Sequence, residues 1–221
     1  MTNETLAVET ARGSSSAFVA KPDADTNRAV LVIQEYWGVN DHIKDIAGRF
    51  ANEGFIAIAP DLYRGTVTKD KSEASELMRR LPIEDGLETI RKAMAVASDS
   101  YGITHFGIAG FCMGGTYALR AACELEGISA AAPFYGDLPP EDVLKKLTAP
   151  TIFVSATQDG WINPAKVALL EEITAKYELP ITMAKYDADH AFFNNTRPEV
   201  YNETAARDAW ALVIGLFNDK L

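Results

Sequence analysis

The residues best suited to do chemistry are a cysteine, an aspartate and a histidine, each of which follows a short apolar run. Cys112 lies between Gly110 and Gly114, which is the spacing of the G-x-S-x-G turn that presents a nucleophile between a strand and a helix, with sulfur in place of oxygen. Glycines at these positions allow a tight turn and close packing of the helix. The turn also places the thiol at a helix N-terminus, where the helix dipole favours the thiolate. We therefore predict that Cys112 is a nucleophile rather than a small buried apolar residue, and that Cys123 faces the core.

A cysteine nucleophile needs a base, and the chain has three histidines. His190 follows the apolar run 181–186 and lies in a loop, where an α/β-hydrolase sheet presents its histidine. His105 starts the strand whose far end carries Cys112, and about six strand residues span ~20 Å, so it is too distant. His42 is expected early in a helix and exposed to solvent. His190 is therefore the predicted base.

The third member of such a site orients the imidazole and stabilises its charged form. Asp159 follows the apolar run 151–155 and so lies just beyond a strand end. The chain order nucleophile, acid and base then matches that of α/β-hydrolases. Asp187 and Asp189 are rivals because they are close to His190 in sequence, but acidic residues in the same loop more often cap turns.

These three residues require elements that bring strand ends together. Short apolar runs at 29–33, 55–59, 105–109, 128–132, 151–155 and 181–186 predict strands. Stretches with helical spacing or helix-start signals predict helices at 41–53, 72–81, 84–97, 116–125, 163–177 and 198–218. Strands that alternate with helices predict an α/β fold, with a mostly parallel central sheet covered by helices on both faces. No linker separates two parts, so we expect a single α/β-hydrolase domain over residues 1–221.

Composition excludes several classes of partner. The chain has 221 residues with a formal net charge of −10, and it has no cluster of Lys and Arg, so neither nucleic acid nor an anionic membrane surface is an expected partner. Residues 1–16 lack the pattern of a signal peptide, and no apolar run approaches the ~20 residues of a membrane span. The two cysteines lack metal-site spacing. We expect a reduced, cytoplasmic protein without a metal or cofactor.

With these pieces in place, the chain resembles the dienelactone hydrolase family over nearly its whole length. The resemblance is carried by sequence segments at 34–40 (Gln-Glu-Tyr-Trp-Gly-Val-Asn), 60–63 (Pro-Asp-Leu-Tyr), 110–115 and 135–136, together with Asp159 and His190. It implies that Glu35 keeps the Cys112 thiol largely neutral in the resting enzyme and swings away when substrate binds. It also implies that the backbone N–H groups of Tyr36 and Met113 form the oxyanion hole.

The resemblance further implies a substrate pocket and one departure from the family. Eight residues are expected to bind substrate: Trp37, Tyr63, Lys71, Met78, Tyr135, Trp161, Phe192 and Asn194. Family members that act on dienelactone hold its carboxylate with two arginines, whereas Lys71 and Asn194 occupy the corresponding positions here. One lysine clamps a carboxylate less well than two planar guanidinium groups. The acidic protein also exerts no long-range attraction on anions, which favours neutral or aromatic esters and lactones.

Two functions from different classes follow from these residues. The first is a cysteine-dependent hydrolase of small lactones or carboxylic esters that forms an acyl-thioester, with thioesters and phosphotriesters as further electrophiles. The second is a thiol-based sensor or binding protein that has this fold without turnover. The predicted assembly is a monomer or weak homo-oligomer.

Overall fold

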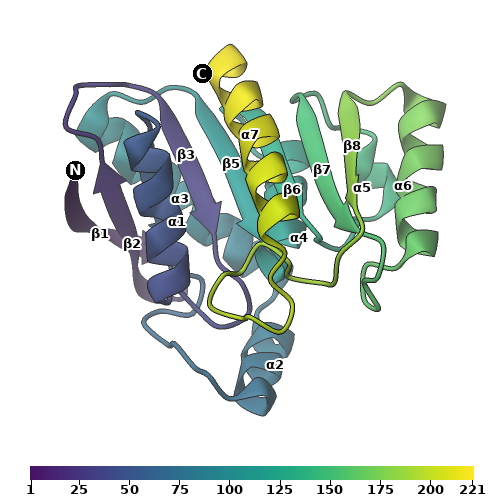
Figure 1. Ribbon diagram of the computed structural model, residues 1–221. Helices are drawn as coiled ribbons and strands as arrows, with labels where there is room; N and C mark the ends of the chain where they lie inside the picture. Colours follow the sequence, from purple (N-terminus) through teal and green to yellow (C-terminus); the bar gives the residue numbers. More distant parts are fainter. The chain divides into compact units, whose positions relative to one another are not determined.

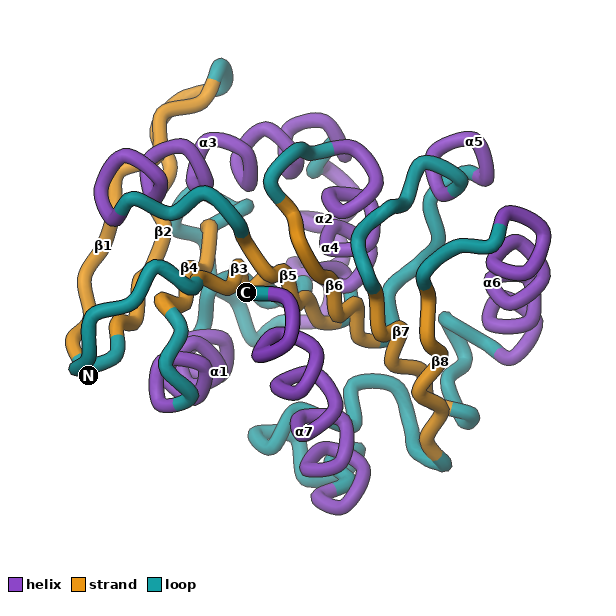
Figure 2. Tube along the Cα trace, turned by 90° about the horizontal axis from the view of Figure 1, so that it is seen from above, coloured by secondary structure: helices purple, strands orange, loops and turns teal.

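The computed structural model describes all 221 residues, which divide into two compact units, Met1–Phe106 and Gly107–Leu221. The first unit contains, in chain order, β1 (Thr2–Thr10), β2 (Gly13–Lys21), β3 (Ala29–Ile33), α1 (Asp41–Asn52), β4 (Ile56–Pro60), α2 (Lys71–Arg80) and α3 (Ile83–Tyr101) (Figure 1). Its strands run in the order β1-β2-β4-β3, with β3 parallel to β4 and the other pairs antiparallel. Figure 2 shows α1 and α3 on opposite faces of these strands.

The second unit takes up the chain within β5 (Phe106–Phe111). It continues with α4 (Met113–Glu124), β6 (Ile128–Phe134), α5 (Glu141–Leu144), β7 (Thr151–Ala156), α6 (Pro164–Tyr177), β8 (Ile181–Tyr186) and α7 (Glu203–Lys220). The strand order is β5-β6-β7-β8, and both β6–β7 and β7–β8 are parallel. In Figure 2, α4 and α7 lie on opposite faces of this unit's strands. Because helices cover both faces of this unit's strands, β5 is buried along its whole length.

The predicted strands and helices are confirmed, with boundaries that move by a few residues. The largest shift is at α7, which begins at Glu203 and not at residue 198, because the Asn202 side chain accepts the N–H of Ala205 as the N-cap. Helix α3 extends beyond residue 97 to Tyr101 and ends at Gly102, whose φ of 68° closes the helix in the left-handed conformation.

The sequence did not predict the hairpin β1–β2 or the four-residue helix α5. Strand β1 is the edge strand of its unit, and only Val8 in it is buried, so it has no continuous apolar run. The hairpin turn closes at Gly13, with φ 113°, and Thr10 donates its hydroxyl to the carbonyl of Gly13.

One predicted environment is wrong. His42 is not exposed to solvent but only 3% exposed, in the first turn of α1. It shares a helix face with the buried Ile46 and Phe50, four and eight residues further on. A polar side chain at the helix start thus turns inward because its spacing matches the apolar face.

Candidate active site

Cys112 lies at the strained junction between β5 and α4. It is the N-cap residue of α4, with φ 56° and ψ −118°, a conformation rare for a residue with a side chain. Its N–H donates to the carbonyl of Phe134 at 3.1 Å, and its carbonyl accepts the N–H of Gly115 at 2.9 Å. The side chain is 8% exposed. Backbone bonds to the neighbouring strand and to the following helix therefore hold the thiol at the apex of the turn.

The glycines around Cys112 are required by contacts with backbone. A Cβ on Gly110 would lie 2.0 Å from the carbonyl oxygen of Gly114, and one on Gly115 would lie 2.4 Å from the carbonyl oxygen of Phe134. Real Cβ atoms do not approach backbone so closely, and backbone cannot move aside as a flexible side chain can. Gly110 and Gly115 are thus explained by packing of α4 against β5 and the end of β6.

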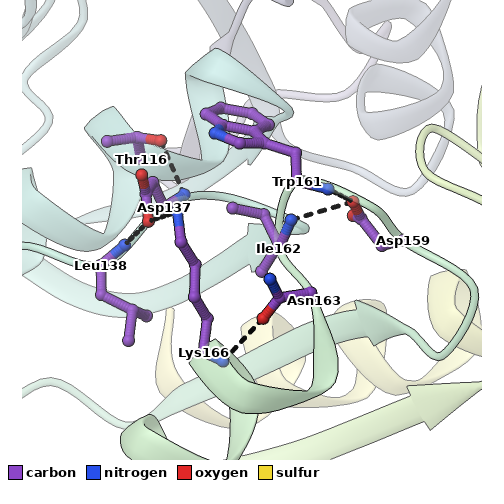
Figure 3. Close-up of polar contacts among 8 residues, drawn as sticks. All are labelled: Thr116, Asp137, Leu138, Asp159, Trp161, Ile162, Asn163 and Lys166. Carbon is purple, nitrogen blue, oxygen red and sulfur yellow. Dashed lines mark hydrogen bonds and ion pairs between the residues drawn. The ribbon is translucent and has the colours of Figure 1, made fainter.

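Asp159 and His190 are in direct contact. Oδ2 of Asp159 lies 2.5 Å from Nδ1 of His190, and the Asp159 side chain is fully buried whereas His190 is 25% exposed. The other carboxylate oxygen of Asp159 accepts the N–H groups of Trp161 at 2.7 Å and Ile162 at 2.9 Å (Figure 3). A single carboxylate therefore positions both the imidazole and the loop that follows β7.

The ionisation of Asp159 fits this role. Burial raises the pKa of its carboxyl, but the hydrogen bond and positive charge of His190 act in the opposite direction. The two backbone N–H groups add to this effect, and the net result is a pKa below the ordinary aspartate value. Asp159 is thus a carboxylate at neutral pH and can orient the imidazole.

The loops after β7 and β8 are tied together beside this pair. Asp187 accepts the Thr157 hydroxyl at 3.2 Å and the Gln158 amide at 2.8 Å, and the Gln158 N–H donates to the carbonyl of Ala188. Asp187 therefore joins two loops, and Asp189 is exposed. Of the three aspartates, Asp159 is the one that contacts the imidazole.

Two aromatic rings flank His190. The Tyr135 ring lies 5.0 Å from the imidazole and the Trp161 ring 5.5 Å, both edge-to-face. Tyr135 directly follows Phe134, the residue that accepts the Cys112 N–H. Cys112 and His190 thus contact two adjacent residues at the end of β6. Trp161 is 36% exposed and so presents part of its ring to solvent.

Three other predicted residues of this unit are placed as follows. Met113 is the first residue of α4. Phe192 is fully buried and packs against the rings of Tyr135 and Tyr186. The Asn194 side-chain oxygen accepts both the N–H and the hydroxyl of Thr196, so it holds a turn of its own loop. Their roles in binding stay predictions.

The first unit holds the remaining predicted residues on the loops after β3 and β4 and on α2. Glu35 is 1% exposed, and the rings of Tyr36 and Trp37 pack together at 4.2 Å. Tyr63 is buried, and its N–H donates to Asp61. These four residues are thus well fixed within the unit.

Lys71 and Met78 lie apart from these loops, at the first position and in the last turn of α2. Lys71 is exposed and Met78 half-buried. Thr68 lies on the segment between β4 and α2. Its N–H donates to the carbonyl of Trp37 at 3.1 Å, which connects this segment to the loop after β3.

The sequence did not predict a polar cluster that lies next to Trp161. Lys166 of α6 pairs with Asp137, whose N–H donates to the hydroxyl of Thr116 on α4 (Figure 3). No motif marks these residues, because an Asp after Tyr-Gly and a Lys near a helix start are both common. No group of three or more His, Cys, Asp or Glu side chains is arranged to hold a metal ion, and no helix has the length and apolar character to cross a membrane.

Comparison with known proteins is consistent across sequence and structure. The model of the dienelactone hydrolase family matches residues 16–221. Proteins named "Putative carboxymethylenebutenolidase" from Aquifex aeolicus and Saccharolobus solfataricus are 30% identical over 206 residues and 32% identical over 238 residues. These matches cover 87% of this chain and 88% of the Aquifex protein, and 89% of this chain and 91% of the Saccharolobus protein.

Solved structures agree with this assignment. A crystal structure named "Putative Dienelactone Hydrolase" from Klebsiella pneumoniae superposes with a TM-score of 0.90 at 27% identity and covers 99% of both chains. A dienelactone hydrolase-like promiscuous phosphotriesterase from metagenomic libraries has a TM-score of 0.89 at 18% identity, covering 99% of this chain and 98% of its own, and shows the same fold. The protein therefore has the α/β-hydrolase fold, is a hydrolase of carboxylic esters or lactones, and belongs to the dienelactone hydrolase family.

Proposed function

We propose that this protein cleaves small lactones or carboxylic esters through a covalent acyl-thioester on Cys112, with His190 as general acid and base and Asp159 as its orienting carboxylate. The observation that carries the proposal is the 2.5 Å contact between Asp159 and His190, in the unit whose nucleophile turn holds Cys112 at φ 56°. Nucleophile, base and orienting acid are the three parts that acyl transfer through a side chain requires.

The reaction begins when the Cys112 thiolate attacks the carbonyl carbon of the substrate and the carbonyl oxygen becomes an oxyanion. We propose that the N–H groups of Tyr36 and Met113 stabilise this oxyanion, and one such donor is worth about 3 kcal/mol in enzymes that catalyse acyl transfer. The C–O bond then breaks, and His190 gives its proton to the leaving oxygen. The acyl group remains on sulfur as a thioester.

The second half of the reaction releases the acid. His190 takes a proton from water, the hydroxide formed attacks the thioester carbonyl, and the C–S bond breaks to regenerate the Cys112 thiolate.

We propose that Glu35, buried on the loop after β3, suppresses thiolate formation before substrate binds. We also propose that the two compact units act as one catalytic domain, which the family match across both of them supports.

Neutral or aromatic substrates are the proposed preference. Asn194 and Lys71 replace two arginines of the family pattern, the Asn194 side-chain oxygen is engaged by Thr196, and the net charge is −10. The rings beside His190 belong to Tyr135 and Trp161, which suits a flat apolar group.

The deciding experiment is burst kinetics on an activated aryl ester with wild type, Cys112→Ala and Cys123→Ala. We expect Cys112→Ala to lower turnover by at least about 1000-fold, because the acyl-thioester is lost, and Cys123→Ala to leave turnover unchanged. Trapping of one acyl group per chain on Cys112, seen by mass spectrometry, supports the proposal. Unchanged turnover in Cys112→Ala contradicts it.

The same experiment distinguishes the rival function. A thiol sensor without turnover would release one equivalent of alcohol per chain and then stop. A disulfide sensor also needs a second thiol within reach, but Cys123 lies at the far end of α4, and a separation of eleven positions corresponds to about 16 Å along a helix. Cysteines whose Cα atoms are more than about 7 Å apart do not form a bond without backbone movement.

A further inference from the structure

Lys166 and Asp137 form an ion pair that the proposed chemistry does not use. Nζ of Lys166 lies 2.7 Å from Oδ1 of Asp137, and both side chains are about one-third exposed, at 33% and 35%. The pair connects three segments of the second unit (Figure 3). Lys166 is in the first turn of α6, Asp137 lies on the loop after β6, and Asp137 is anchored by the Thr116 hydroxyl at 2.8 Å in the first turn of α4.

The same ammonium group also lies over an aromatic ring. Nζ of Lys166 is 5.9 Å from the centroid of the Trp161 ring, within the range of a cation–π interaction. The Trp161 ring in turn meets the His190 imidazole edge-to-face at 5.5 Å. A continuous series of contacts therefore runs from Asp137 through Lys166 and Trp161 to the proposed base.

Trp161 is thus held at two points. Its backbone N–H is fixed by the Asp159 carboxylate, and its ring is approached by Lys166. The ring is 36% exposed, so packing alone does not fix its rotamer, and a partly exposed side chain gains order from each added contact. The ammonium is therefore one of the contacts available to orient the indole beside His190.

The ion pair with Asp137 limits how strongly Lys166 can attract a substrate anion. A lysine paired at 2.7 Å with a carboxylate is already neutralised locally, so it attracts a substrate anion weakly. Partly exposed ion pairs contribute little to stability, commonly between 0 and about 1 kcal/mol. Placement of the ammonium over Trp161 is therefore the specific consequence of this pair.

We propose that Lys166 is a positioning residue that, held by Asp137, keeps the Trp161 indole against His190 and so makes the site selective for substrates with a flat aromatic group. The inference rests on the proposed function, because it assigns the substrate class of that same site. Lys166 itself does not touch the reacting atoms.

The kinetic test compares leaving groups in wild type, Lys166→Met, Lys166→Arg and Asp137→Asn. Phenyl acetate carries an aromatic leaving group, and trifluoroethyl acetate carries an activated leaving group without a ring. We expect Lys166→Met to raise KM for phenyl acetate about two- to five-fold, the size of an exposed cation–π contact, with kcat little changed. KM for trifluoroethyl acetate should stay the same, Lys166→Arg should restore the wild-type preference, and Asp137→Asn should resemble Lys166→Met.

The helix offers a matched control. Lys176, in the last turn of α6, also pairs with a carboxylate at 2.7 Å, that of Glu141, and also lies over an aromatic ring, that of Tyr177 at 5.0 Å. Lys176→Met removes the same kinds of contact from the same helix, away from His190. We expect it to leave both KM values unchanged.

A fluorescence measurement tests the placement without turnover. Protonated imidazole quenches a neighbouring indole, so the signal of Trp161, taken as the difference between wild type and Trp161→Phe, should fall when His190 is protonated. We expect Lys166→Met to weaken this pH-dependent quenching, and to have no further kinetic effect in the Trp161→Phe background. Because this signal does not require Cys112 chemistry, it remains informative if Cys112→Ala retains activity and the proposed mechanism fails.

Two results would overturn the inference. The first is equal loss in Lys166→Met with and without Trp161, because the lysine would then act independently of the indole. The second is a loss confined to esters that carry a carboxylate, with the preference for phenyl over trifluoroethyl acetate intact, because Lys166 would then bind anions directly.

Discussion

The nucleophile turn and the Asp159–His190 pair belong to the same unit but are positioned in different ways. Cys112 is held by backbone, through hydrogen bonds at 3.1 and 2.9 Å and through glycines that leave no space for a Cβ. Asp159 and His190 are held by side chains, which form hydrogen bonds and ring contacts across the loops after β7 and β8. Backbone packing allows little change, whereas side-chain contacts can be exchanged one at a time.

This difference separates two kinds of substitution. A change in the turn displaces the path of the chain where β5, β6 and α4 meet, so it should damage the fold and activity together. A change in the acid–base pair leaves the backbone bonds of the turn in place, so it should damage chemistry more than stability. The following predictions test that separation, beginning with the largest effect.

Gly110→Ala should unfold the protein or leave it strongly destabilised and inactive. The new Cβ would lie 2.0 Å from the Gly114 carbonyl oxygen, a contact that only a shift of backbone relieves. We expect a loss of about 3 kcal/mol or more in the free energy of unfolding, measured by urea denaturation.

Gly215→Ala is the matched control for that substitution. Gly215 lies within α7, and nothing is within 4 Å of its Cβ position, so alanine should stabilise the helix by about 0.5–1 kcal/mol. A Gly110→Ala protein with wild-type stability and activity would show that the turn is not fixed by backbone packing.

Asp159→Asn should preserve the fold and lower kcat by about 10³- to 10⁴-fold, because the amide no longer stabilises the charged imidazole. Circular dichroism and steady-state kinetics on an aryl ester check both statements. Asp189→Asn is the control, since Asp189 is exposed one residue before His190, and we expect its kcat to match wild type. Similar losses in both variants would contradict the assignment of Asp159 as the orienting acid.

The same variant tests the pH dependence of stability. The folded-state pKa of Asp159 is below its ordinary value, so the carboxylate stabilises the fold at pH values above about 4, the pKa of an unfolded aspartate. That contribution is lost as pH falls through the lower folded-state pKa. Unfolding free energies measured from pH 7 down to 3 should therefore decline in wild type, and this part of the decline should be absent from Asp159→Asn.

The sequence predicted the backbone-held part of the site more completely than the side-chain-held part. Gly110 leaves a signature because close backbone contact admits almost no other residue there. The apolar runs before Asp159 and His190 are equally visible, since buried parallel strands need them. Asp137 and Lys166 leave no signature, because a salt bridge between a loop and a helix depends on where distant segments meet and not on local spacing.

The hairpin strand β1 and the burial of His42 were both missed for the same physical reason. Strand β1 is an exposed edge, so its pairing with β2 comes from backbone hydrogen bonds that few apolar residues announce. His42 was expected in solvent from its polar type, but its place on the face of Ile46 and Phe50 buries it. Local composition fails where tertiary contacts decide the environment.

Cys123→Ala should have the smallest effect on turnover. It allows the thiols at the two ends of α4, Cys112 and Cys123, to be compared. Burial raises the pKa of the Cys123 thiol to about 12, so almost no thiolate forms there at neutral pH. Cys112 stands at the N-terminus of α4 on the strained turn, where the helix dipole favours an anion. Prolonged exposure to iodoacetamide at pH 7 should therefore alkylate one thiol per folded chain, through the fraction of Cys112 thiolate that remains despite the proposed effect of Glu35, in wild type and in Cys123→Ala alike, and none in Cys112→Ala. Two labels on the folded wild type would show that burial does not protect Cys123 and that position on the helix does not distinguish the two thiols.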